Sequence, residues 1–232
     1  MRSAWSPYYS AVSALLLVLS VIAFSDNLFT DVGQPSNSDP KFIVHGLFGF
    51  AWYALLATQA NLARVGSYRL HRNLGVAAFV VAVGVILSTV YVFVVQWKGW
   101  VNMGAEARAN RMHLAAYAVC LLCAWRYRGD SVWHHRLVFV GTFCMLEPVL
   151  ARTYDPLIMS WAKPLLGGVY TSAVDEAAFV TYLWVTWIGF FISLALYDLR
   201  TRKRVHAVTA AGMGWLALAT TISLLFGSGP VP

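Results

Sequence analysis

The chain has 232 residues, of which 59% are hydrophobic and only 12% are charged, and its formal net charge is +7. Soluble domains carry roughly 25% charged residues, so this chain has too few polar side chains to cover a water-exposed surface. The positive residues lie in short clusters between apolar runs, which excludes a basic face for nucleic acid. The composition therefore predicts a single transmembrane domain over residues 1–232.

Seven apolar runs follow one another along the chain. They cover residues 8–24, 42–63, 74–97, 105–125, 132–150, 177–199 and 205–226. A bilayer-crossing helix needs about 20 predominantly apolar residues, and most of these runs meet that length. We therefore expect an all-α fold, a polytopic transmembrane helical bundle of about seven spans.

The charges that flank these runs predict their orientation. Segment 25–40, after the first run, contains three Asp residues and no Lys or Arg. The loops after the second, fourth and sixth runs carry the basic residues, namely Arg64, Arg69, Arg72, Arg126, Arg128, Arg136, Arg200, Arg202, Lys203 and Arg204. Because basic loops stay in the cytoplasm, we expect the N-terminus inside, the C-terminus outside and a multi-pass protein of the cell (inner) membrane.

Two segments leave alternatives open. The first run, with the small residues Ala23 and Ser25 at its end, is either an uncleaved helix, which we favour, or a signal peptide whose removal leaves six spans. The connection 151–176 contains the apolar stretch 156–169 with Trp161, and Tyr170 follows it. This stretch is either a helix in the outer interface or an ordinary loop with aromatic anchors.

Segments 41–97 and 104–150 resemble each other as helical hairpins. In each, a histidine lies near the start of the first helix, His45 or His113, and a His-Arg pair opens the second helix, His71 or His135 (with His134 as the alternative). Repeated units in membrane proteins often build a site at their interface.

The histidines of these hairpins are the candidate cofactor ligands. Ionisable groups within a bilayer are costly and mark functional sites, and haem takes neutral imidazoles as axial ligands. The pairs would be His45 with His113 and His71 with His135. Residues 45 and 64 are about 28 Å apart along a helix, which puts the two pairs at opposite faces of the membrane and favours one haem, at the first pair.

Other polar residues near these histidines have more than one interpretation. Arg108 and Arg111 would hold haem propionates or lipid phosphate, because Arg offers a fork of donors to an anion. Glu147 would be a proton-relay group, a quinone contact, or an ion-pair partner of Arg111 or Arg152.

Three cysteines lie in apolar runs and are expected to pack as small hydrophobes: Cys120, Cys123 and Cys144. Eight tryptophans are assigned mostly to the interfacial belts: Trp52, Trp97, Trp100, Trp125, Trp133, Trp161, Trp184 and Trp187.

Two resemblances rest on these motifs. The segments that carry the first are 45–52, 59–60, 71–75, 126–130 and 135–136. Across residues 42–152 they resemble a family of bacterial multi-helix membrane proteins of unknown function, which implies a multi-helix membrane fold. The placement of the histidines on the second to fifth runs also resembles the ascorbate-reducible cytochromes b of the five-sixty-one type. That resemblance implies two haems b, on His45 with His113 and on His71 with His135, although the inner histidines lie at a loop edge here.

Three functional classes remain open on the sequence. The first is a membrane haem b protein that moves electrons to or from a quinone or another redox partner. The second is a non-haem Fe or Zn site at His45, His113 and Glu147. The third is a cofactor-free structural or assembly subunit. A retinal protein is excluded because the last run has no lysine for a Schiff base.

Overall fold

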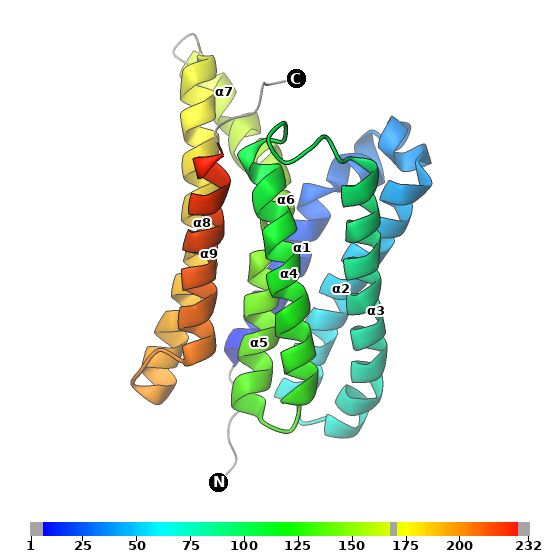
Figure 1. The fold of residues 1–232 in the computed structure, drawn as a ribbon, viewed down its shortest axis with the longest axis vertical. Helices are drawn as coiled ribbons and strands as arrows, with labels where there is room; N and C mark the ends of the chain where they lie inside the picture. The colour runs from blue at the N-terminus through cyan, green and yellow to red at the C-terminus, as the bar shows by residue number, and fades with distance from the viewer. Residues whose placement is uncertain (1–6, 168–170, 227–232) are drawn as a thin grey trace. The chain divides into compact units, whose positions relative to one another are not determined.

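The computed structural model describes residues 7–167 and 171–226, and every regular element in those ranges is helical (Figure 1). The order is α1 (Pro7–Ala23), α2 (Pro40–Arg64), α3 (Tyr68–Val95), α4 (Ala105–Arg126), α5 (Ser131–Cys144), α6 (Glu147–Tyr154), α7 (Ser160–Leu166), α8 (Ser172–Arg202) and α9 (Ala207–Leu225). Shorter turns of π- and 3-10 helix lie at Asp26–Thr30, Pro35–Ser38 and Asp155–Met159. The prediction of an all-α helical fold is confirmed.

Four helices, α2, α3, α8 and α9, are long and apolar enough to cross a membrane. The α5 helix and the α6–α7 segment together make a fifth candidate, bent by 53° at the break between them. The predicted fifth run is thus not one straight helix. The first helix has 17 residues, and α4 carries Glu106, Arg108 and Arg111 in its first two turns.

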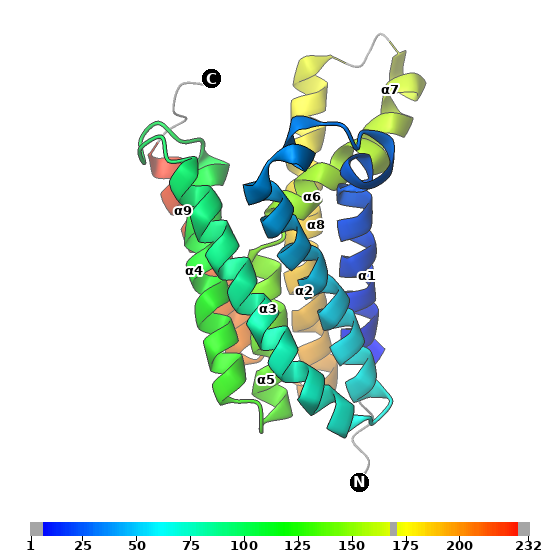
Figure 2. The ribbon, with the colours of Figure 1, turned by 90° about the vertical axis from the view of Figure 1, so that its right-hand side faces the viewer.

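The chain divides into two compact units, residues 1–97 and 98–232. In unit 1, α2 packs against both α1 and α3 (Figure 2). One face of α3 exposes an apolar stripe at helical spacing: Val76, Val80, Val83, Leu87, Val90 and Val94. A long apolar stripe without a polar counterpart fits contact with lipid chains.

In unit 2, α4 and α5 form an antiparallel hairpin, and α9 packs against both of its helices. The approach is close at Gly212, where a Cβ would lie 2.5 Å from Val140 of α5. The α8 helix contacts α5, α6 and α9. These contacts hold the break between α5 and α6 inside the unit.

Capping side chains explain where several helices begin. Asp39 accepts the Lys41 amide at the start of α2, and Asp130 accepts the amides of Val132 and Trp133 at the start of α5. A hydrogen bond from the Lys41 side chain holds the pKa of Asp39 below its ordinary value. At the start of α9, the His206 Nδ1 atom accepts the amide of Val208, so this histidine is a helix cap.

Three helices, α2, α3 and α8, begin before the apolar runs that predicted them. The α3 helix begins at Tyr68, six residues before the run 74–97, so His71 lies within a helix and not in the loop edge expected from the sequence. The reason is that a helix continues through the polar interface, where apolar residues are no longer required. The described part of the connection after α6 is helical as far as Leu166, and Tyr170 lies outside the described residues.

Candidate functional site

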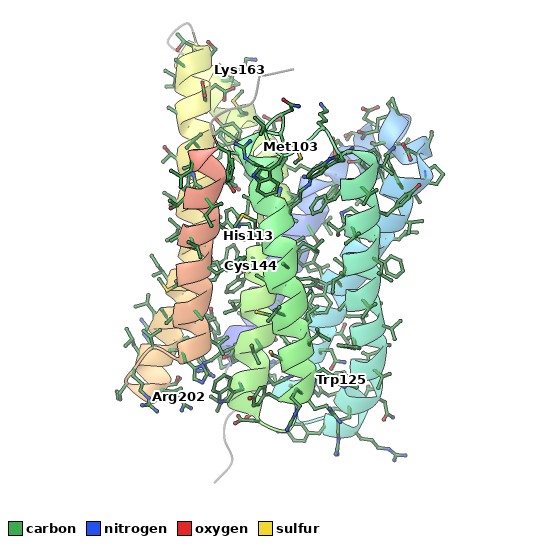
Figure 3. The ribbon with its side chains drawn as sticks, in the orientation of Figure 1. Met103, His113, Trp125, Cys144, Lys163 and Arg202 are labelled. Atoms are coloured by element: carbon green, nitrogen blue, oxygen red, sulfur yellow. The ribbon has the colours of Figure 1, made fainter. Side chains whose placement is uncertain are left out.

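His113 is a fully buried imidazole near the middle of α4. Figure 3 shows it between Met103, before the helix, and Trp125, near its end. Its exposed fraction is 0%, and the edge of its ring packs against Trp187 of α8 with the centroids 5.2 Å apart. Neither ring nitrogen has a hydrogen-bond partner within the described residues. A buried polar group without a partner costs about 1–3 kcal/mol, so this imidazole is a candidate to bind a group from outside the described residues.

Trp187 fixes the surroundings of that imidazole. Its indole Nε1 donates to the carbonyl oxygen of Phe143 at 2.6 Å, and its exposed fraction is 2%. The assignment of this tryptophan to an interfacial belt was therefore wrong, and Trp52, 7% exposed, is buried as well. Hydropathy does not distinguish a tryptophan at the interface from one in the core, so the sequence held no signal for the contact with His113.

The break between α5 and α6 lies next to this pair. The α5 helix ends at Cys144 and α6 begins at Glu147. In a continuous α-helix the N–H of residue 148 would donate to the carbonyl of Cys144. Pro148 has no N–H, so this hydrogen bond is missing and the helix breaks. The carbonyl of Phe143, in the last turn of α5, accepts both the Trp187 indole and the Leu146 amide. Irregular backbone at membrane depth is tolerated only where protein or a cavity covers it.

Glu147 is tied to α4 by a neutral partner. The Asn110 Nδ2 atom donates to its Oε2 atom at 2.7 Å. In the described parts of the chain Glu147 forms no ion pair, so the expected pairing with Arg111 or Arg152 is wrong. Those two guanidinium groups donate instead to carbonyls of their own helices, of Ala107 and Pro148.

Arg108, expected at the haem propionates, is buried at 0% exposure and donates to the protein backbone. Its Nε and Nη2 atoms donate to the Ser223 carbonyl at 3.1 and 2.9 Å. Its Nη1 atom donates to the carbonyls of Trp100 and Met103. Arg108 thus joins the start of α4 to the end of α9, which is a structural role.

A second buried polar cluster lies at the other end of unit 2. Arg136 of α5 and Asp198 of α8 form an ion pair, with exposed fractions of 3% and 0%, and the Nε–Oδ1 distance is 2.7 Å. The second carboxylate oxygen accepts the Thr209 hydroxyl and the His206 amide. Asp198 was not predicted as a site residue, because it is a single acidic residue next to a cluster of four basic residues in the sequence.

His45 lies in unit 1, with its Nδ1 atom near two hydroxyl groups of α3. Its Nδ1 atom is 3.3 Å from the Ser88 hydroxyl and 3.4 Å from that of Thr89. Both hydroxyls donate to the Val85 carbonyl, so their oxygens are free to accept the Nδ1 proton. This tautomer leaves the lone pair on Nε2, which is the arrangement that orients metal-binding histidines. Ser88 also lines a largely apolar cavity of about 400 Å³ between α2 and α3.

His71 and His134 occupy matching places in the two hairpins. Each is the fourth residue of its helix, α3 or α5. Each places Nδ1 near a backbone carbonyl in the last turns of the preceding helix: Gln59 at 3.2 Å for His71, and Ala124 at 3.0 Å for His134. By this contact His134, and not the neighbouring His135, corresponds to His71. The shared contact supports the internal repeat.

No group of three or more His, Cys, Asp and Glu side chains close enough to hold a metal ion occurs among residues 7–167 and 171–226. The three cysteines are free thiols. The fold and site define an all-helical protein with helices fit to cross a membrane. Comparison of the chain with known protein families, curated proteins and solved structures finds no match.

Proposed function

We propose that the chain is a membrane haem b protein that carries electrons, with His113 as one axial ligand. The observation that carries this proposal is the fully buried imidazole of His113, whose two nitrogens have no partner among the described residues. Bound haem would supply one-electron redox chemistry, and a neutral imidazole is its usual ligand. An iron–nitrogen bond would satisfy an atom that the described residues leave without a hydrogen bond.

His45 of unit 1 remains a separate candidate for a haem ligand in this proposal. The support is that the hydroxyls of Ser88 and Thr89 lie within hydrogen-bond distance of its Nδ1 atom, a contact of the kind that orients metal-binding histidines. His71 and His135 remain the candidates for a second haem, with His134 in place of His135 if the repeat is followed through backbone contacts.

The protein's own contribution is to hold these imidazoles and to keep water away. The contact with Trp187 restricts rotation of the His113 ring, and the hydrogen bond to the Phe143 carbonyl in turn fixes Trp187. Leu146 and Leu150, both at 0% exposure, make the surroundings of the break apolar. Low polarity around a redox centre sets its potential and limits side reactions.

The test of the proposal is the absorption spectrum of the purified protein. We expect a Soret band that shifts on addition of dithionite, with about one haem per chain. Replacing dithionite by a short-chain quinol then tests a lipid-soluble quinone as the redox partner. A colourless protein that contains stoichiometric Fe or Zn would support the non-haem site at His45, His113 and Glu147, and a metal-free one would support a structural role. Either result contradicts the proposal.

We also propose seven spans in the cell membrane: α1, α2, α3, α4, α5 with α6, α8 and α9. The N-terminus would be inside, because arginines cluster in and beside the connections after α2, α4 and α8, mostly in the helix ends that flank them. Alkaline phosphatase, which folds only in an oxidising compartment, should be active when fused after Phe226 and inactive when fused after Arg128. Activity in the reverse order would refute this orientation.

A further inference from the structure

Basic side chains gather at one end of unit 2, in the connection after α4 and at the end of α8. Figure 3 shows Trp125 of α4 and Arg202 of α8 at this same end. Six cations, all exposed, make up what we name the basic patch: Arg126, Arg128, Arg200, Arg202, Lys203 and Arg204. No ion pair among the described residues uses any of these six side chains.

Aromatic rings join the two connections that carry the basic patch. Tyr127, in the connection after α4, stacks on Trp133 of α5 with the ring centroids 5.2 Å apart. The Trp133 ring meets the ring of His206, in the connection after α8, edge to face at 4.9 Å. The buried ion pair between Arg136 and Asp198 also ties α5 to α8 at this end. The cations of the two connections therefore share one surface on a fixed base.

The negative charges beside the basic patch are already engaged. Asp130 is exposed, but one of its carboxylate oxygens accepts the amides of Val132 and Trp133 at the start of α5. Asp198 is fully buried and is paired with Arg136. The surface is therefore strongly positive, and an anion bound there would relieve the repulsion between neighbouring cations.

Exposed leucines precede the cations on the same helix faces. Leu122 and Arg126 of α4 are four residues apart, as are Leu196 and Arg200 of α8, and the two leucines are 62% and 48% exposed. Residues four apart lie on one face of a helix. Each face thus changes from an apolar side chain to a cation within about 6 Å along the axis. A phospholipid makes the same change, from acyl chain to phosphate, which favours a lipid over a soluble anion as the occupant.

Lys203 ends α8 in a backbone conformation that favours glycine. Its φ is 62° and its ψ is 9°, and it is the one residue other than glycine with a positive φ in the described parts of the chain. A side chain is strained in this left-handed region, and helices commonly end there with glycine. Strained residues cluster at ligand-binding sites. The chain thus has a cation at the position where glycine would cost less.

We propose that the basic patch binds the phosphate groups of acidic phospholipids in the adjoining leaflet. The guanidinium groups of the patch offer forked pairs of N–H donors to phosphate oxygens. The acyl chains of the bound lipid lie along the exposed faces of α4 and α8 that carry Leu122 and Leu196. This binding goes beyond the proposed haem function and is independent of it.

The test is the fluorescence anisotropy of an acyl-labelled phosphatidylglycerol titrated with the purified full-length chain in a non-ionic detergent. Labelled phosphatidylcholine, which has no net charge, is the lipid control. We expect tighter binding of phosphatidylglycerol, and a loss of about fivefold in its affinity for each of Arg126→Gln and Arg200→Gln. The control variant is Arg152→Gln with Lys163→Gln, which removes two exposed cations away from the patch and should bind as the wild type does. Figure 3 labels Lys163 at the other end of the bundle.

Lys203→Gly separates the charge from the fold. It removes a cation and relieves the backbone strain, so the affinity for phosphatidylglycerol should fall by about fivefold while the melting temperature stays the same or rises. Equal affinities for the two lipids in the wild type would overturn the inference, as would equal losses in the patch and control variants. Displacement of the labelled lipid by a short acidic peptide at lower concentrations than by unlabelled phosphatidylglycerol would assign the patch to a soluble partner and also overturn it.

Discussion

Replacement of His113 by alanine is expected to abolish the haem spectrum of the purified protein. The imidazole is fully buried, and no described residue offers its nitrogens a hydrogen bond, so the substitution removes the proposed ligation together with the packing against Trp187. Loss of a group that merely orients a ligand weakens metal binding by 10–100-fold, so loss of the ligand itself should cost about 100-fold or more. The measurement is haem per chain, from the Soret absorbance of protein that elutes as a folded species.

The matched control for that experiment is His206→Ala. His206 is a helix cap whose Nδ1 atom accepts the Val208 amide, and no role in binding a cofactor follows from that contact. We expect it to retain the full haem content, with a loss of stability of about 1 kcal/mol for the missing cap. Equal haem in the His113→Ala variant and the wild type would remove the basis of the proposal.

Asp198→Asn is expected to destabilise the fold more than any other single substitution considered. The change leaves the buried guanidinium of Arg136 without its counter-charge and weakens the acceptor of Thr209. Removal of one partner of a buried ion pair costs about 3–5 kcal/mol, because the remaining charge is uncompensated. Thermal unfolding in detergent should show a large fall in melting temperature or a loss of folded protein.

Two further variants separate charge from packing in this cluster. Asp155→Asn makes the same chemical change at an exposed position and should leave the melting temperature unchanged. The double variant Arg136→Met with Asp198→Leu removes both charges and should be more stable than Asp198→Asn alone. A melting temperature for Asp198→Asn equal to that of the wild type would show that the pair does not stabilise unit 2.

The helices were predictable from the sequence because apolar runs of this length have few alternatives. Every predicted run corresponds to a helix, and the two disagreements have local causes. The run 132–150 breaks at residues 145–146, and Pro148 within that run was a signal that could have been used. The α3 helix starts before its apolar run because His71 and its neighbours form a polar first turn.

The side-chain contacts of the site could not be predicted from the sequence, because they join residues that are far apart along the chain. Arg136 and Asp198, which form the ion pair, are 62 residues apart in the sequence, and Phe143 and Trp187, which share a hydrogen bond, are 44 residues apart. Helical periodicity is uninformative where a helix is apolar nearly all round, so it does not tell which face of α4 is buried. The sequence identified His113 and Glu147 as candidate site residues. It did not predict that no described residue forms a hydrogen bond with the His113 imidazole, or that the Asn110 side-chain amide is the hydrogen-bond partner of Glu147.

Chemical rescue tests ligation by His113 most directly. The variant His113→Gly removes the side chain and leaves space for a free imidazole in the core of unit 2. We expect this variant to lack the Soret band when purified with haemin and to regain it when imidazole is added. His206→Gly should show the Soret band with haemin alone and should not change when imidazole is added. A His113→Gly protein that binds haem normally without imidazole, or that remains colourless in its presence although folded, would contradict the account.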